Sequence, residues 1–339
     1  LKNSFFIIII LIANKAINRQ FKTIFREKLM NKKRIAVIGL GGIAQKGHLP
    51  VLTTMPGVEL LFYSRTAEKV KNLADQYRIP KWTASLDELL DWKADCAYIL
   101  TPTPTHAELA TICLNAGMDV FIEKPATASV GETRQLAELA DKKKRIAMVA
   151  FNRRYAPLTK KGKELWGKRT VTMANFQKSR SKPGFRGIRM HITEELVHVI
   201  DIVRFFGGEA KAITTKVRVD KDDMVLEVVS LLKYESGGLA SLTASLQAGH
   251  WYEHYELNGE GATLNLNVFS DLHFTEMECT QSWKEPYDST WNSNLYGRGF
   301  IGQIEHFLIC VETRQQPQTN LWDSVKTQQL VEDIIAKAG

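Results

Sequence analysis

Short apolar runs alternate with longer amphipathic stretches in the first half of the chain. The runs are rich in β-branched residues and occupy positions 35–38, 58–63, 96–100, 120–122 and 146–150. Runs that are apolar throughout are typical of strands buried on both faces, and their alternation with helices predicts a parallel sheet covered on both sides. We therefore predict an α/β fold that begins with a doubly wound parallel sheet.

The pattern changes near residue 150. Positions 224–234 and 239–247 are longer strand candidates, and in the second one leucine and alanine alternate with serine and threonine. One apolar and one polar face are typical of an antiparallel sheet that is covered on one side. Gly237 and Gly238 between the candidates predict a hairpin turn. With amphipathic helices predicted at 193–206, 301–312 and 323–337, the second half is an α+β domain with an open, mostly antiparallel sheet.

These patterns divide the chain of 339 residues into three parts. We expect residues 30–150 to form the first domain and residues 151–339 the second, with the last helix a candidate to pack back on the first. The apolar run at 5–13 is shorter than the roughly 18 to 20 residues of a membrane-spanning helix. Because Met30 directly precedes the first strand, we predict that residues 1–29 lie outside the functional protein. A membrane-tethered factor is the alternative that this run leaves open.

The net charge of +8 lies entirely in the first 34 residues, which hold nine basic residues against one acidic residue. The rest of the chain sums to zero, so its charge gives no case for a nucleic-acid partner. The four cysteines form no C-x-x-C pair, which argues against a structural zinc site, and we expect no metal. Free cysteines are typical of the reducing cytoplasm, where we expect the protein to act.

A glycine-rich turn follows the first predicted strand and begins a helix. It reads Gly-Leu-Gly-Gly-Ile-Ala from Gly39, the G-x-G-x-x-A form of the dinucleotide-binding fingerprint of a Rossmann domain. Gly39 permits the tight turn, Gly41 lets a pyrophosphate approach the backbone, and Ala44 lets the helix pack closely on the strand. Backbone N–H groups at the helix start, around Gly42 and Ile43, can hold the anionic pyrophosphate. A purely structural turn is the alternative, and the strand-turn-helix context favours the dinucleotide site.

The end of the second predicted strand bears on which dinucleotide binds. A site specific for NAD usually places a carboxylate there for the ribose hydroxyls, whereas this chain has Ser64, Arg65 and Thr66. A hydroxyl beside a guanidinium can hold the 2′-phosphate of NADP, and Arg65 can also stack on the adenine. The alternative is that Thr66 only caps the next helix and Arg65 is solvated. The missing carboxylate makes NADP the preferred cofactor, with NAD as the alternative.

Two further turns follow predicted strands and therefore lie at the carboxyl edge of the sheet, where ligands bind. Glu123, Lys124 and Pro125 form one of them, and the proline fixes the turn and orients the lysine. The other, residues 101–106, reads Thr-Pro-Thr-Pro-Thr-His, with Thr105 a candidate helix cap. Taken without further information, a solvated lysine and a histidine at a helix start are the simpler interpretation.

The three motifs together resemble those of the Gfo/Idh/MocA family of NAD(P)-dependent oxidoreductases. The Glu-Lys-Pro turn is the most specific part, and the resemblance runs from about Lys33 to the C-terminus. Residues 151–157, 196–201 and 299–307 are further similar to MviM-like virulence-factor proteins, a likeness that supplies no substrate. The resemblance implies that Lys124 contacts the substrate hydroxyl and the nicotinamide ribose, and that the protein is a homodimer or homotetramer. Besides the glycine-rich turn, the expected cofactor contacts are Ser64, Arg65, Thr66, Thr101, Pro102, Thr103, His106, Glu123 and Lys124.

Members of this family commonly carry Asp-x-x-x-His on a helix that faces the nicotinamide. Here His198 matches the histidine, and Glu194 stands at the aspartate position. A spacing of four residues places both on one helical face, so the carboxylate can orient the imidazole or share its proton. We expect Lys124, His198 and Glu194 to be catalytic, and the same three residues with Arg153 to bind substrate. The alternative is an ordinary Glu/His pair on a surface helix.

Two classes of function remain open. One is an oxidoreductase that transfers hydride between nicotinamide and a hydroxyl or carbonyl carbon of a sugar-like or polyol substrate, with Lys124 exchanging the hydroxyl proton. The other is a catalytically silent protein that senses NADP(H) or a sugar through the same cleft, an alternative that Glu194 makes more credible. The sequence names neither the substrate nor the direction of the reaction.

Overall fold

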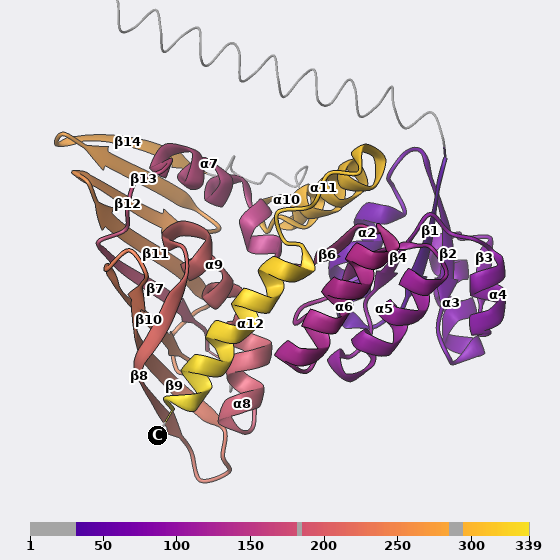
Figure 1. The fold of residues 1–339 in the computed structure, drawn as a ribbon, viewed down its shortest axis with the longest axis horizontal. Coiled ribbons are helices and arrows are strands. Elements are labelled where there is room, and N and C mark those ends of the chain that lie inside the picture. Colours follow the sequence, from indigo (N-terminus) through magenta and orange to yellow (C-terminus); the bar gives the residue numbers. More distant parts are fainter. Residues whose placement is uncertain (1–31, 182–184, 285–293, 339) are drawn as a thin grey trace, which may run out of the picture.

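Six parallel strands form the sheet of the N-terminal domain in the computed structural model, which describes residues 32–181, 185–284 and 294–338. Their order, β3-β2-β1-β4-β5-β6, is that of a doubly wound dinucleotide-binding sheet (Figure 1), which confirms the predicted fold class. The prediction for residues 1–29 lies outside the described residues. The strands are β1 (Lys33–Ile38), β2 (Val58–Tyr63), β3 (Lys81–Thr83), β4 (Cys96–Ile99), β5 (Asp119–Ile122) and β6 (Ala147–Val149).

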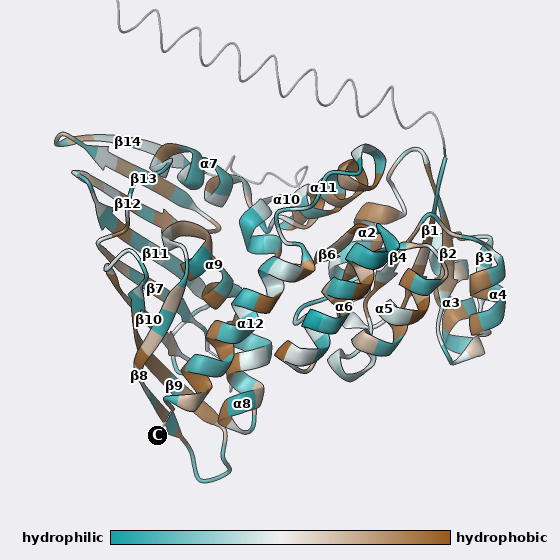
Figure 2. Cartoon of the chain, viewed as in Figure 1, coloured by the Kyte–Doolittle hydropathy of each residue, from teal (hydrophilic) through white to brown (hydrophobic). Residues whose placement is uncertain are grey.

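The side chains of β1 alternate between two hydrophobic cores, one on each face of the sheet. Ala36 and Ile38 pack in one core and Ile35 and Val37 in the other, which explains why the strand is apolar throughout. Helices on both faces carry hydrophobic as well as hydrophilic residues, as Figure 2 shows. They are η1 (Ala44–His48), α2 (Leu49–Leu52), α3 (Ala67–Tyr77), α4 (Leu86–Asp91), η2 (Thr103–Thr105), α5 (His106–Asn115) and α6 (Val130–Lys143).

Eight strands form the sheet of the C-terminal domain, in the order β14-β13-β12-β11-β7-β10-β9-β8. Neighbouring strands are antiparallel except β7 and β10, so the predicted mostly antiparallel sheet is confirmed. The predicted hairpin turn lies between β9 and β10, where Tyr234 N donates to Gly238 O at 2.8 Å. The strands are β7 (Met173–Ser179), β8 (Ala210–Val219), β9 (Val225–Tyr234), β10 (Leu239–Ser245), β11 (Tyr252–Gly259), β12 (Ala262–Asn267), β13 (Asp271–Glu276) and β14 (Cys279–Lys284).

Helices pack against one face of this second sheet. α7 contacts β12 and β13, α9 contacts β7 and β8, and α12 contacts β8. α12 also contacts α6 and β6, so it lies between the two domains (Figure 1). In the described part of the chain, no helix is long and apolar enough to cross a membrane. The helical segments are η3 (Asn152–Tyr155), α7 (Pro157–Trp166), α8 (Ile188–His191), η4 (Ile192–Leu196), α9 (Val197–Gly207), α10 (Asn294–Gly297), α11 (Phe300–Thr313) and α12 (Leu321–Ala336).

The helix predicted at 193–206 is not a regular α-helix. The range consists of a π-helical turn, η4, followed by α9, and the short helix α8 directly precedes them. A π-turn holds more residues per turn than an α-helix and is found frequently at functional sites. The turn includes Glu194, so the side chains of Glu194 and His198 do not share one face in the way that α-helical spacing predicts.

Two histidines away from the strand ends accept hydrogen bonds that require neutral rings. Phe185 N donates to His191 Nδ1 at 3.4 Å, and Gln318 N donates to His306 Nε2 at 3.3 Å. Burial lowers the pKa of each ring to about 4, with nearby cations adding to the effect. Both rings therefore stay uncharged in the folded protein at neutral pH.

We expect the free energy of unfolding to fall as the pH drops below about 6.5, the ordinary pKa of histidine. Below that pH the unfolded chain binds protons on both rings, whereas the folded chain does so only near pH 4. Each histidine therefore costs about 1 kcal/mol of stability by about pH 5.5. Urea denaturation across this range measures the effect, and His191→Gln should flatten the profile. An unfolding free energy that stays constant down to about pH 5 contradicts the prediction.

Candidate functional site

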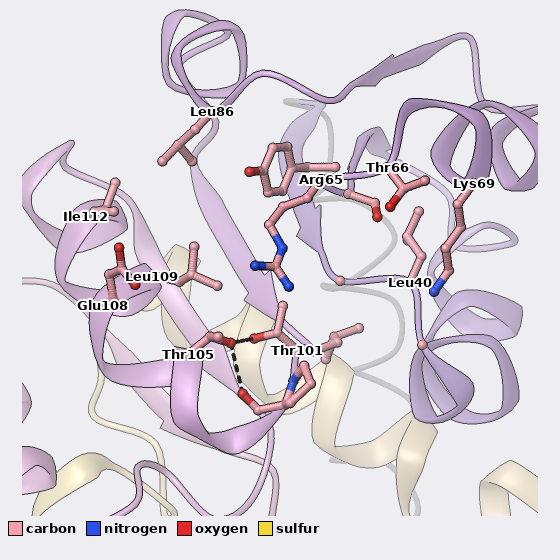
Figure 3. A pocket seen from close by; sticks show the side chains of 16 residues that line it. Leu40, Arg65, Thr66, Lys69, Leu86, Thr101, Thr105, Glu108, Leu109 and Ile112 are labelled. Atoms are coloured by element: carbon pink, nitrogen blue, oxygen red, sulfur yellow. Dashed lines mark hydrogen bonds between the residues drawn. The ribbon is translucent and has the colours of Figure 1, made fainter.

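A pocket of about 460 Å³ opens at the carboxyl ends of β1, β2 and β4 (Figure 3). The strand order reverses between β1 and β4, and this is where the ligand crevice of a doubly wound sheet forms. The volume lies in the range of small-molecule sites. Gly39, Leu40 and Gly41 line the pocket from the turn after β1, so the structure places the glycine-rich motif on a ligand-sized cavity.

The glycines of this turn differ in whether the fold itself requires a residue without a side chain. Gly39 has a φ of +92°, and a Cβ there would lie 2.6 Å from Thr101 Cγ2, so the fold itself requires glycine. A Cβ on Gly41 or Gly42 would meet no atom within 4 Å. Their missing side chains therefore serve no packing purpose and leave the backbone open to a ligand. This is what a pyrophosphate at the start of a helix needs, so the residues fit a dinucleotide.

The segment after the turn matches the fingerprint with one difference. Ala44 is fully buried in the core that contains Ile35 and Val37, as its predicted packing role requires. Ile43 is 42% exposed beside the turn. The helix starts in α-helical conformation at Gly42 and Ile43, where Gln45 N donates to Gly41 O at 3.1 Å, and then passes into the π-helical turn η1.

Polar and cationic side chains line the wall of the pocket after β2. Ser64, Arg65 and Thr66 lie there as predicted, and Figure 3 shows Arg65 extending into the pocket. Thr66 stands at the N-cap position of α3 but makes no capping hydrogen bond, so its hydroxyl is available to a ligand. Lys69 joins this wall and was missed from the sequence. Its position four residues after Arg65 on a predicted helix could have indicated it.

The turn after β4 is held by its own side chains. Thr105 Oγ1 donates to Thr101 Oγ1 at 2.7 Å and to Pro102 O at 2.8 Å (Figure 3). Thr105 occupies the predicted N-cap position of α5. Its side chain forms no capping hydrogen bond, so the prediction that it caps the helix is wrong. Thr101 and Pro102 line the pocket as expected.

His106 joins the two turns that the sequence singled out. Its Nδ1 lies 2.9 Å from Pro125 O and its Nε2 2.8 Å from Thr101 O, and the residue is 1% exposed. Both nitrogens are therefore engaged with backbone carbonyls. The ring of His106 therefore ties the Thr101 turn to the Lys124–Pro125 turn, and its contact with the cofactor stays a prediction.

Glu123 also points away from the ligand side. Its Oε1 lies 2.8 Å from His48 Nε2, and its Oε2 accepts from Lys124 N at 3.0 Å. Burial alone would raise the pKa of Glu123, but the hydrogen bond and charge of His48, with Lys124, hold it below its usual value. Glu123 therefore fixes the lysine turn to the glycine-rich helix instead of contacting the cofactor as expected. Sequence reasoning missed His48, because a lone histidine in an apolar helix carries no signal of its partner.

Lys124 lies at the end of β5, where the two domains meet. Its Nζ donates to Glu194 O at 2.7 Å and lies 3.5 Å from Glu194 Oε2. Glu194 Oε1 in turn accepts from Thr103 Oγ1 at 2.8 Å. The peptide bond between Lys124 and Pro125 is cis. Three residues predicted from separate motifs, Thr103, Lys124 and Glu194, are thus brought together in one hydrogen-bonded group.

His198 lies near Lys124 but does not receive the carboxylate that the sequence suggested. Its Nδ1 is buried without a hydrogen-bond partner among the described residues, while the residue as a whole is partly exposed. Glu194 faces Lys124 and Thr103 instead, because the π-turn shifts it around the helix axis. Burial lowers the pKa of His198 well below its usual value, and three nearby cations lower it further, so the ring is neutral at pH 7. These cations are Arg153, Lys124 and Lys178.

Arg153 is held in a buried ion pair. Its Nε and Nη2 donate to the two carboxylate oxygens of Glu253, each at 2.7 Å, and Tyr255 OH donates to the same carboxylate at 3.0 Å. Sequence reasoning could not supply Glu253, which lies 100 residues further along the chain. The expected substrate contact of Arg153 is therefore limited to the parts of the guanidinium that Glu253 leaves free.

Asp201, which shares the helix with His198, is bound to Arg154 through both carboxylate oxygens. Among the described residues, no group of three histidine, cysteine, aspartate or glutamate side chains is placed to hold a metal ion.

Comparison with known proteins agrees with this geometry. Residues 33–151 match the family model described as "Oxidoreductase family, NAD-binding Rossmann fold". The chain is 29% identical to YceM of Salmonella typhimurium, named as an oxidoreductase, over 90% of this chain and 98% of that protein. It is 22% identical to scyllo-inositol 2-dehydrogenase (NAD(+)) of Bacillus subtilis, over 84% of this chain and 87% of the enzyme. The crystal structure of the dehydrogenase MviM from Clostridium difficile superposes with a TM-score of 0.81 at 26% identity, covering 90% of this chain and 99% of that one.

Proposed function

We propose that this chain is a member of the Gfo/Idh/MocA family of oxidoreductases and acts as an NADP-dependent dehydrogenase or reductase of sugar-like hydroxy compounds, which the match of residues 33–151 and the similar proteins support. The observation that carries the proposal is the position of Lys124 Nζ at the carboxyl edge of the sheet, hydrogen-bonded to Glu194 and beside a neutral His198. Within the family, the likeness to MviM favours the MviM-like branch.

The residues around Lys124 are suited to moving a proton. The nicotinamide supplies hydride transfer when it is bound. Oxidation of a substrate hydroxyl starts from Lys124 with a neutral amine, whose Nζ accepts the hydroxyl proton and becomes an ammonium. Reduction starts from the ammonium form, which donates a proton to the carbonyl oxygen and leaves the neutral amine. Glu194 and Thr103 keep Nζ in place. His198, neutral and partly exposed, orients the hydroxyl by a hydrogen bond.

The substrate class follows from the relatives together with the site. Scyllo-inositol 2-dehydrogenase is named for a cyclic polyol, so we propose a polyhydroxylated substrate for this chain as well. A fluorescence titration with NADPH and NADH, followed by a screen of polyols, aldoses and their oxidised forms, tests the proposal. Turnover of at least one such compound is expected. Cofactor binding without any turnover would instead support a catalytically silent sensor.

NADP is proposed over NAD because Arg65 and Lys69 both line the pocket and residues 64–66, directly after β2, include no carboxylate. We expect Arg65→Gln and Lys69→Gln each to weaken NADPH binding by about tenfold, as charge-assisted hydrogen bonds to a phosphate are lost. NADH binding should change little. Lys71→Gln, on the same helix but outside the pocket, is the matched control. Equal losses for the two nucleotides in the Arg65 and Lys69 variants would show that these residues do not read the 2′-phosphate.

The uncovered face of the second sheet supports the expectation of an oligomer. Large apolar side chains are exposed on adjacent strands of this face, and Leu239 lies beside Met173 in the β7–β10 register. We propose that a second subunit covers them and that the protein is a homodimer or homotetramer. The exposed residues are Met173, Ile213, Val229, Leu231 and Leu239.

A further inference from the structure

Arg298, between α10 and α11, forms no ion pair with any of the described residues. Its guanidinium lies 4.4 Å from the centre of the Trp251 ring and 5.6 Å from that of Phe269. Among the described residues, no carboxylate lies within ion-pair distance of it. Asn152 Nδ2 donates to Arg298 O at 2.9 Å, which fixes this segment beside η3. A partly buried guanidinium with no counter-charge is unfavourable unless a ligand supplies one.

A second guanidinium lies over the same two rings. Arg153 stands 5.9 Å from the centre of Trp251 and 5.2 Å from that of Phe269. Burial lowers the pKa of Arg298, and the positive charge of Arg153 lowers it further. The charge of Glu253 acts in the opposite direction on the pKa of Arg298, but Glu253 is a single carboxylate and both of its oxygens are hydrogen-bonded to Arg153. The two arginines therefore present one uncompensated positive charge.

This charge lies in the same region as Lys124. Arg153 and Lys124 both lower the pKa of His198, so both lie near its ring. Three of the cations in this region have a carboxylate partner each: Lys124 with Glu194, Lys178 with Glu195, and Arg153 with Glu253. Arg298 is the fourth and has no carboxylate partner among the described residues. The excess of positive charge in this region therefore belongs to Arg298.

Resting on the function proposed above, we propose that Arg298, backed by Arg153 and flanked by Trp251, binds an anionic group on the substrate. The substrate class is then a sugar acid or a sugar phosphate rather than a neutral polyol. A guanidinium binds carboxylate and phosphate alike through paired N–H donors, so the site fits both chemistries. Trp251 offers an apolar face against which the carbon skeleton of a sugar can pack.

Three sugars with one ring and different charge test the proposal: D-glucose, D-glucuronate and D-glucose 6-phosphate. Calorimetry on the NADP-loaded protein is expected to show that at least one anionic sugar binds about tenfold or more tightly than glucose. The stronger of the two anions identifies the group that the subsite takes. Arg298→Gln should abolish this preference without changing NADPH affinity, and Arg298→Lys should retain part of it. Raising the salt concentration should reduce the preference in the wild type.

Arg34→Gln is the matched control. Arg34 also stacks on a tryptophan, 4.5 Å from the centre of the Trp92 ring, but it lies on β1, away from Arg298 and Trp251. It should keep the anion preference. Equal or undetectable binding of all three sugars with normal NADPH binding would overturn the anion subsite and leave the proposed function standing. Failure of the wild type to bind NADPH would overturn the proposed function, while the same sugars titrated without cofactor would still decide the subsite. Melting curves of each variant show that it is folded.

Discussion

Replacing Lys124 with methionine is expected to lower kcat by about a thousandfold and to leave NADPH affinity nearly unchanged. Methionine has a similar length and removes the only atom, Nζ, that we propose exchanges the substrate proton. Positioned general acid-base groups contribute roughly 10² to 10⁴ in rate, which sets the size of the effect. Stopped-flow turnover at saturating substrate and a fluorescence titration with NADPH measure the two quantities separately.

Lys69→Met is the matched control for this experiment, because Lys69 lines the nucleotide end of the same crevice. It should weaken NADPH binding and leave kcat at saturating cofactor intact. A Lys124→Met variant with kcat within a few-fold of wild type would remove the lysine from the chemistry. If NADPH affinity and kcat fell together, the result would show that the main role of Lys124 is to stabilise the site through its ion pair with Glu194.

Five of the six strands of the first domain were predictable because they are mostly buried on both faces. A short β-branched apolar run such as residues 35–38, followed directly by a glycine turn, is typical of such a strand. β3 escaped prediction for the opposite reason. It is a three-residue edge strand, Lys81–Thr83, in which the first two residues are exposed, so it leaves no apolar run. Its existence depends on pairing with β2 rather than on its own composition.

The candidate site was predictable as a set of turns but not as a set of contacts. Strand ends place Lys124 and the Thr101 turn at one edge of the sheet, and sequence order gives those ends directly. The direction of each side chain depends on partners far away in the chain: Glu123 turns to His48 and Arg153 to Glu253. The π-turn that moves Glu194 towards Lys124 changes the number of residues per helical turn over a few residues only. The spacing of hydrophobic residues does not reveal such a short change.

The two glycines at the start of the fingerprint allow packing and binding to be separated by one substitution each. Gly39→Ala is expected to destabilise the fold by about 3 kcal/mol, since it combines strained backbone with overpacking. Its φ is +92°, and its Cβ would lie 2.6 Å from Thr101 Cγ2 and 2.9 Å from the carbonyl of Leu100. Gly41→Ala meets no protein atom within 4 Å, so its unfolding free energy should stay within about 0.5 kcal/mol of wild type.

Gly41→Ala, which should leave stability almost unchanged, should have a large effect on cofactor binding. The new methyl group of Gly41→Ala enters the space that a pyrophosphate needs at the helix start, so NADPH affinity should fall at least about tenfold in a fully folded protein. Urea denaturation and NADPH titration on the same samples measure both effects. If Gly41→Ala bound NADPH as tightly as wild type, the pyrophosphate would not lie against the backbone of Gly41. If Gly39→Ala were as stable as wild type, the tight turn after β1 would not need glycine, and the packing of Thr101 against it would be wrong.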